Sequence, residues 1–333
     1  MALHKKIAML GSGSWGTALA LHLSRQGHQV NLWSIEEDHV LEMQNERVNR
    51  RYIPDHPFPD ELNAFIKLED TLKDTDDIIL AVPSIGFKDT LEKIKPLLKP
   101  TSRILWVTKG FDEASGQLLH KTFEDTFGEK YPYGALSGPS FALEVAKGLP
   151  TAVVIASKNA EFAKDMQDTF NSPHFRVYIS SDIIGVQIGG AVKNVIAIAT
   201  GISDGMKLGT NSRCAIITRG LTEVTRLGVA LGGKPETFTG LSGLGDLVLT
   251  CTDNQSRNRR FGLELSKGTD VEAAIKSVGQ VVEGARNSEL VVNTAKEHNI
   301  EMPIAEVIAK IVSGEITSTE AMQSLLARKA KPE

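Results

Sequence analysis

The sequence predicts an α/β protein in which a doubly wound, mostly parallel sheet is followed by an all-α C-terminal domain. Three observations support this prediction. Short apolar segments with strand character alternate with helical segments up to about residue 180, an order typical of parallel sheets covered by helices on both faces. A glycine-rich turn directly follows the first strand. Beyond residue 180 the strand pattern stops, and only helical periodicity continues.

Length and composition limit the possible functions. A chain of 333 residues is too long for one small core, so we expect two domains, residues 1–180 and 181–333. The net charge of −4 argues against a nucleic-acid partner, which would favour a basic chain. Two cysteines, Cys214 and Cys251, are too few for a disulfide framework or a zinc site, and we expect no metal. So few cysteines suit a protein of the reducing cytoplasm. The apolar segment at the start of the chain is too short for a signal peptide.

The beginning of the chain has the pattern of a dinucleotide-binding unit. Its parts in order are a strand over Ile7–Leu10, the turn Gly11-Ser12-Gly13-Ser14-Trp15-Gly16, a helix over Thr17–Gln26 and a strand over Val30–Trp33. In this context G-x-G-x-x-G places a pyrophosphate at a helix N-terminus. Gly11 would permit the tight turn, Gly13 the approach of the phosphates, and Gly16 the packing of helix on strand. We therefore predict a Rossmann-like first domain that binds NAD or NADP.

The end of the second strand leaves the choice of coenzyme open. An acidic residue there contacts the ribose 2′-OH of NAD, whereas a nearby arginine accommodates the 2′-phosphate of NADP. Here Ser34 and Ile35 follow the strand, and the acids Glu36, Glu37 and Asp38 come slightly later. Three basic residues, Arg47, Arg50 and Arg51, are candidates for a 2′-phosphate, although such clusters are more often solvated surface.

The alternation continues through the rest of the first domain. Strands are predicted over Ile78–Val82, Ile104–Thr108, Gly134–Ser137, Ala152–Ile155 and Phe175–Ile179, and helices over Phe87–Lys95, Gln117–Phe127, Phe141–Lys147 and Glu161–Phe170. Ligands of open α/β sheets bind beyond the carboxyl ends of strands. Lys109 follows one such end, where it could hold a phosphate, pair with an acid or be a solvated loop lysine. Ser140 follows another, where it could cap a helix, contact a ligand or do both.

The second domain begins with an apolar helix that contains a single charged residue. Between Asp182 and Asp204, Lys193 is the only charge among Ile, Val, Ala and Gly. Burial disfavours the charged form of an amine and lowers its pKa towards neutrality, which suits proton transfer. A lysine that snorkels to the surface is the alternative. A membrane span is disfavoured, because a central lysine and two neighbouring amides, Gln187 and Asn194, would be costly in lipid.

Two later segments carry polar groups suited to a small charged substrate. Asp246 lies among apolar neighbours, so we expect it to be paired, with Lys193 as the candidate partner. The segment Thr250–Arg260 combines hydroxyls, amides and guanidinium groups, which bind phosphate esters. For Arg259 and Arg260 a solvated loop is the alternative. Further helices are predicted over Arg213–Leu227, Phe261–Lys267, Val271–Val278, Ala285–Glu297, Ile304–Val312 and Ser318–Ala327.

Taken together, these motifs closely resemble the bacterial, soluble type of NAD(P)-dependent glycerol-3-phosphate dehydrogenase over nearly the whole chain. The resemblance rests on the glycine turn and on Thr108–Gly110, Ser137–Ala142, Gly189–Asn194, Gly243–Leu247, Cys251–Asn258 and Gln280–Gly284. An ordered set of motifs across two domains is far more specific than the glycine turn alone.

The resemblance implies a role for each matching residue. Lys193 would be the proton acceptor, with Asp246 holding it in place. The substrate site would contain Lys109, Gly138, Ser140, Lys193, Asp246, Ser256, Arg257 and Asn258. The coenzyme would contact Gly11, Gly13, Ser14, Trp15, Gly16, Lys109, Ala142, Arg257, Val281 and Glu283. One family position after the second strand often carries a basic or polar residue; here it is Ile35, which leaves the 2′-phosphate contact in question.

The implied reaction is the reversible NAD(P)H-dependent reduction of dihydroxyacetone phosphate to sn-glycerol 3-phosphate. The resemblance further implies a cytoplasmic homodimer that supplies phospholipid synthesis. A related two-domain hydroxyacid dehydrogenase is one alternative, and it would require carboxylate-binding residues in place of the phosphate-binding set. A non-catalytic dinucleotide-binding module is another, but it would leave Lys193 and Arg257 without a purpose.

Overall fold

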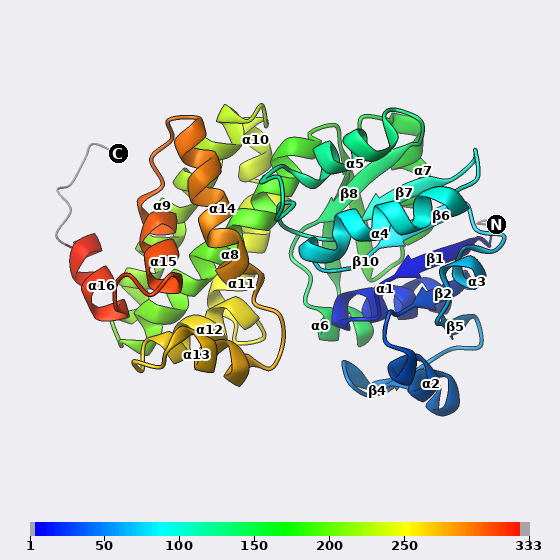
Figure 1. Cartoon of the computed structure of the whole chain (residues 1–333), viewed down its shortest axis with the longest axis horizontal. Coiled ribbons are helices and arrows are strands. Elements are labelled where there is room, and N and C mark those ends of the chain that lie inside the picture. Colours follow the sequence, from blue (N-terminus) through cyan, green and yellow to red (C-terminus); the bar gives the residue numbers. More distant parts are fainter. Residues whose placement is uncertain (1–3, 327–333) are drawn as a thin grey trace. The chain divides into compact units, whose positions relative to one another are not determined.

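The computed structural model describes residues 4–326, which form two compact units (Figure 1). The first unit ends at Ile183 and contains the described chain before it except Glu113–Gly116. The second unit contains Glu113–Gly116 and the described chain from Ile184 onward. Ala327, the last residue of the final predicted helix, lies outside the described residues.

Within the described part of the first unit, eight strands form one sheet in the order β10-β9-β8-β7-β6-β1-β2-β5. The strands are β1 (Lys6–Leu10), β2 (Gln29–Trp33), β5 (Leu62–Phe65), β6 (Asp77–Leu80), β7 (Arg103–Trp106), β8 (Tyr133–Ser137), β9 (Thr151–Ala156) and β10 (Phe175–Ser180). From β5 to β8 all neighbours are parallel, in the order typical of dinucleotide-binding sheets. The predicted mostly parallel α/β sheet is confirmed, whereas the antiparallel pairing of β9 with β8 was not foreseen.

Helices cover both faces of this sheet. They are α1 (Ser14–Arg25), α2 (Glu37–Glu46), α3 (Leu68–Leu72), α4 (Phe87–Ile94), α5 (Leu119–Phe127), α6 (Ala142–Ala146) and α7 (Ala160–Phe170). Alternate strand residues face opposite sides. Leu105 points into the core shared with α1 and α7. Its neighbour Trp106 stacks on Tyr133 at 5.6 Å between ring centroids and contacts Phe87 of α4.

The sequence did not predict the region between β2 and β6. Helix α2 buries only three side chains, and β5 is a four-residue strand at the edge of the sheet, so neither has a strong apolar period. A short antiparallel ribbon, β3 (Val48–Asn49) with β4 (Ile53–Pro57), lies between them in the chain.

From Ile184 onward the described residues of the second unit form helices joined by turns, with no strand, as predicted. It contains α8 (Ile183–Gly205), α9 (Gly209–Ala230), α10 (Pro235–Phe238), the π-helical turn Leu241–Gly245, α11 (Asp246–Thr252), α12 (Arg257–Leu265), α13 (Val271–Val278), α14 (Glu283–Glu297), α15 (Pro303–Val312) and α16 (Ser318–Leu326). By length and composition α8 could cross a membrane, but 94% of its most apolar window is buried within the structure, as in the core helix of a globular protein.

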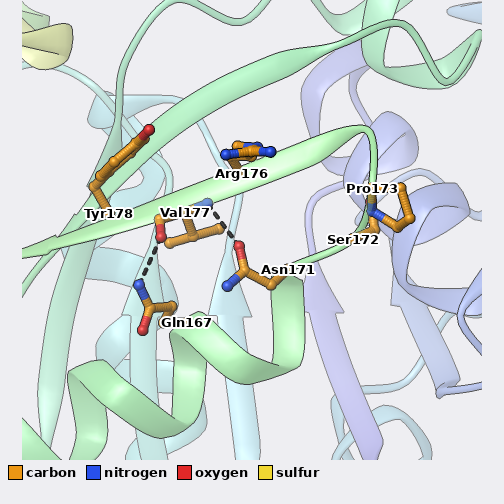
Figure 2. A pocket seen from close by; sticks show the side chains of 7 residues that line it. All are labelled: Gln167, Asn171, Ser172, Pro173, Arg176, Val177 and Tyr178. Carbon is orange, nitrogen blue, oxygen red and sulfur yellow. Dashed lines mark hydrogen bonds between the residues drawn. The ribbon is translucent and has the colours of Figure 1, made fainter.

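Strand β10 forms one edge of the sheet, and side-chain amides occupy part of that edge. The backbone N–H of Val177 donates to Asn171 Oδ1 at 2.8 Å, and the Val177 carbonyl accepts from Gln167 Nε2 at 2.7 Å (Figure 2). Both amides come from the end of α7. They use the two outward-facing backbone groups that another strand would otherwise pair with.

Candidate active site

The glycine turn has the shape that a bound pyrophosphate requires. A Cβ on Gly11 would lie 2.6 Å from the Ala81 carbonyl oxygen, and one on Gly16 would lie 2.0 Å from the Gly11 carbonyl oxygen. A Cβ on Gly13, by contrast, would meet nothing within 4 Å. Gly13 is the N-cap of α1 and offers no side chain to the first turn of the helix. The space above Gly13 and the N–H groups of that turn therefore fit a phosphate.

A second observation supports this fit. The indole N–H of Trp15 is buried and has no hydrogen-bond partner among the described residues. Buried donors are normally satisfied, so an unpaired donor in the glycine turn is consistent with an acceptor supplied by a ligand. Ser14 and Trp15 are both partly exposed on the first turn of α1.

The ends of β7 and β8 bring Lys109 and Ser140 to one carbonyl group. Lys109 Nζ donates to the Gly138 oxygen at 3.3 Å, and Ser140 Oγ donates to the same oxygen at 2.9 Å. Gly138 has φ of +139°, a conformation that favours glycine. The prediction that Ser140 caps a helix is wrong: α6 begins at Ala142, and its N-cap is Phe141, without a side-chain cap. The hydroxyl of Ser140 instead closes its own turn.

Lys193 is buried and paired in the helical unit. Its side chain is 9% exposed, and Nζ lies 2.5 Å from Asp246 Oδ1 and 2.8 Å from Thr250 Oγ1. The snorkelling alternative is therefore excluded, and the expected pairing with Asp246 is present. Desolvation of two charges is costly, and the mutual attraction and hydrogen bonds offset it. The carboxylate favours the ammonium form of the amine, in opposition to burial.

A close backbone contact fixes this pair. A Cβ on Gly189 of α8 would lie 2.3 Å from the Ser242 carbonyl oxygen, so α8 and the π-helical turn touch backbone to backbone. Lys193 lies one helical turn beyond Gly189, and Asp246 lies four residues beyond Ser242. The two side chains are thus brought together from adjacent elements. π-helical turns occur often at functional sites.

The start of α12 carries the residues predicted to bind phosphate. Ser256 is the N-cap and accepts from the Arg259 backbone N–H at 3.2 Å, so Arg257 and Asn258 are the first two helical residues. The helix therefore begins before its predicted start at Phe261. Arg257 is half-buried, and an arginine on the first turn adds its positive charge to the N–H groups there.

Asn258 ties three helices together. Its Nδ2 donates to Asn194 Oδ1 of α8 at 2.9 Å, and its Oδ1 accepts from the backbone N–H of Gly284 in α14 at 2.8 Å. Asn194 directly follows Lys193, and Asn258 directly follows Arg257. The bond between the two amides therefore links the backbone segments that carry Lys193 and Arg257. The half-buried residues Val281 and Glu283 flank the same end of α14.

Arg259 differs from its predicted environment. The alternative of a solvated loop is wrong for this residue, because its side chain is 8% exposed, pairs with Asp204 at 2.5 Å and donates to Asn254. It anchors α12 to the end of α8. Arg260 is exposed.

Comparison with known proteins now decides the family. Residues 6–163 match the family described as NAD-dependent glycerol-3-phosphate dehydrogenase N-terminus, and residues 182–323 match the corresponding C-terminus. The chain is 52% identical over 327 residues to glycerol-3-phosphate dehydrogenase [NAD(P)+] of Coxiella burnetii, covering 98% of each chain. It is 51% identical over 328 residues to the enzyme of the same name from Pseudoalteromonas translucida, again covering 98% of each.

A solved structure agrees. The crystal structure of glycerol-3-phosphate dehydrogenase from Coxiella burnetii matches with a TM-score of 0.95 at 51% identity, covering 98% of this chain and 99% of that one. The chain belongs to the NAD-dependent glycerol-3-phosphate dehydrogenase family. The predicted family, the NAD(P)-linked oxidoreductase class and the use of NAD or NADP are thereby confirmed.

One residue that contacts the Lys193–Asp246 pair was not predicted from the sequence. Thr250 Oγ1 accepts from Lys193 and donates to the Asp246 carbonyl at 2.6 Å. Its position four residues after Asp246 on one helix face was the signal that could have revealed it. The neighbouring Cys251 is fully buried, and burial raises the pKa of its thiol to about 12. It therefore stays protonated and is no nucleophile at neutral pH.

The hollow drawn in Figure 2 is not part of this site. It is lined by Gln167, Asn171, Ser172, Pro173, Arg176, Val177 and Tyr178 at the β10 edge. None of the residues predicted to bind coenzyme or substrate lines it.

Proposed function

We propose that the chain catalyses the reversible reduction of dihydroxyacetone phosphate to sn-glycerol 3-phosphate with NADH or NADPH. The single observation that carries this proposal is the buried Lys193, held by Asp246 and Thr250, in a chain of this family. When bound, the nicotinamide supplies or accepts the hydride at C2. Residues 1–180 would bind the coenzyme, and residues 181–333 would bind the substrate and carry the catalytic amine.

Lys193 would transfer the proton. In reduction its ammonium group donates to the alkoxide that develops at C2, and in oxidation the neutral amine accepts the hydroxyl proton. Asp246 fixes the amine by a 2.5 Å bond and stabilises its charged form. Thr250 restricts the rotation of the amine further with a 2.8 Å bond. An amine fixed in this way requires little reorganisation during the reaction.

The substrate phosphate would be bound at the start of α12. Arg257 supplies the guanidinium group, and Ser256 and Asn258 hold the first turn of the helix in place. Binding energy from the phosphate would then align C2 with the amine. Lys109, Gly138 and Ser140 would complete the substrate site. The coenzyme would contact Gly11, Gly13, Ser14, Trp15, Gly16, Lys109, Ala142, Arg257, Val281 and Glu283.

The test is the rate of NADH and NADPH oxidation with dihydroxyacetone phosphate and, in parallel, with a 2-oxo acid of similar size. We expect turnover with the phosphate ester alone. Turnover only with the 2-oxo acid would favour a hydroxyacid dehydrogenase, and coenzyme binding without turnover of any substrate would favour a non-catalytic module. We further propose that the enzyme acts in the cytoplasm as a homodimer and supplies phospholipid synthesis. Light scattering coupled to gel filtration tests the dimer.

A further inference from the structure

The segment after β2 holds an arginine surrounded by carboxylates. Arg51 donates from Nη1 to Glu36 at 3.0 Å, from Nη2 to Asp38 at 2.7 Å and from Nε to Glu42 at 2.9 Å. All three nitrogens of its guanidinium group therefore have acidic partners, and the two negative charges in excess remain uncompensated within this cluster. We call Arg51, Glu36, Asp38 and Glu42 the Arg51 cluster.

The position of the cluster is what makes it relevant to the coenzyme. Leu10 pairs with Trp33, and the Gly11 backbone N–H donates to the Trp33 carbonyl at 3.0 Å, so the glycine turn and the end of β2 adjoin each other. Glu36 lies three residues beyond Trp33 and is the N-cap of α2. In dinucleotide-binding sheets, residues just beyond this strand meet the ribose that carries either a 2′-OH or a 2′-phosphate.

The other two arginines of the region are also engaged by the chain itself. Arg50 pairs with Glu46. Arg47 donates to the Asn63 side chain at 3.1 Å and to the Pro59 carbonyl at 2.6 Å. All three arginines that could have met a 2′-phosphate therefore have partners within the first unit.

The residue that directly precedes Glu36 adds no charge. Ile35 is 69% exposed, the highest value for a large apolar side chain among the described residues. Its neighbour Ser34 is buried, and its hydroxyl accepts from the Glu36 N–H at 3.3 Å, which turns the chain and leaves Ile35 at the surface. An apolar side chain here can pack against a purine ring but cannot neutralise a phosphate.

We infer that this chain selects NAD(H) over NADP(H) and that the Arg51 cluster is the cause. The inference rests on the proposed function, because it concerns the coenzyme of that reaction. A 2′-phosphate would bring up to two negative charges towards three carboxylates that share one guanidinium group. Binding it requires Arg51 to leave at least one carboxylate. A 2′-OH instead donates to a carboxylate without displacing the arginine.

The strength of this selection depends on salt. The four side chains of the cluster range from 27% to 74% exposed, so water and ions screen their charges. We expect NADH to bind about tenfold more tightly than NADPH at low ionic strength, and the ratio to shrink as salt is added.

The experiment measures dissociation constants of NADH and NADPH for the whole chain by their fluorescence, without substrate. The variant Glu36→Gln/Asp38→Asn releases Arg51 from two carboxylates, and we expect the ratio of the two constants to shift about tenfold towards NADPH. Ile35→Arg, which leaves the cluster intact and adds a cation, should shift it in the same direction. The control Asp125→Asn/Glu129→Gln removes two exposed carboxylates near the end of α5, and it should leave the ratio unchanged.

Three outcomes contradict the inference. NADPH binding as tightly as NADH to the unaltered chain would overturn it while leaving the proposed function intact. An equal shift in the α5 control would assign the effect to net charge and overturn the role of the cluster. Failure of the unaltered chain to bind either dinucleotide would instead overturn the proposed function together with this inference.

Discussion

Lys193 stabilises the fold in addition to its proposed role in the reaction. Its ammonium group donates to the Asp246 carboxylate, which is 1% exposed, so removing the amine leaves a buried charge without that hydrogen bond. Loss of one member of a buried pair costs about 3 to 5 kcal/mol, whereas neutralising both members costs far less. This difference allows the catalytic and structural roles to be separated.

We expect Lys193→Met to lose turnover by a factor of roughly 10² to 10⁴ and to lower the free energy of unfolding by about 3 to 5 kcal/mol. Lys193→Met/Asp246→Asn should recover most of that stability but none of the turnover. Urea unfolding and initial rates of dihydroxyacetone phosphate reduction measure the two effects. If Lys193→Met alone keeps rates within tenfold of those of the unaltered enzyme, Lys193 is not the proton donor.

Glu223 introduces a dependence of stability on pH. Its carboxylate is 2% exposed and accepts from the backbone N–H groups of Ile304 and Ala305, at 2.8 and 3.2 Å, at the start of α15. Burial raises its pKa from 4.5 to about 7, although the two hydrogen bonds act in the opposite direction. The folded state therefore binds a proton more tightly than the unfolded state does.

Because the folded pKa is the higher one, the stability from this group is fully present below pH 4.5 and is lost as the pH rises through 7. The loss is on the order of 3 kcal/mol. Urea unfolding of the unaltered chain and of Glu223→Gln at several pH values between 4.5 and 8 measures it. The difference between the two proteins isolates Glu223 from other titrating groups, and parallel pH profiles would refute this assignment.

At the scale of single elements, two side-chain amides from the end of α7 cover part of the exposed edge of β10. Gln167 and Asn171 bond the carbonyl and the N–H of Val177, while Tyr178 and Ile179 beside it are about half exposed. A strand edge with free backbone groups and apolar side chains favours association between chains.

We therefore expect Gln167→Ala/Asn171→Ala to associate into larger species at concentrations where the unaltered chain does not. Light scattering against concentration measures this. Glu161→Ala/Asp168→Ala, which shortens two exposed side chains of the same helix, is the matched control. If both variants remain as dispersed as the unaltered chain, the amides have no protective role.

The sequence predicted those elements that have a strong apolar period of their own. The strands β1, β2, β6, β7 and β8 were placed closely, because each buries a continuous apolar set. The π-helical turn and α11 were not foreseen, since their shape depends on the contact of Ser242 with Gly189 on a helix distant in sequence. Arg259 was misjudged for the same reason, because its partner Asp204 lies 55 residues away.

At the scale of the whole molecule, the proposed coenzyme contacts lie in segments of both units. NADH should therefore slow amide hydrogen exchange at Gly11–Gly16 and also at Gln280–Gly284. At a hundredfold excess over its dissociation constant, it should stabilise the chain by about 2.7 kcal/mol. Exchange mass spectrometry with and without NADH measures the protection. Protection confined to the glycine turn would show that Val281 and Glu283 do not contact the coenzyme.

The bond between Asn194 and Asn258 joins the residue after Lys193 to the residue after Arg257. The backbone segments that carry the amine and the guanidinium group are consequently tied together within the helical unit before any substrate binds. In the proposed reaction, a ketone one carbon longer or shorter could still be bound through its phosphate group, but its carbonyl group would then lie out of reach of the amine. Selection for a three-carbon substrate would thus begin with the bond between these two amides.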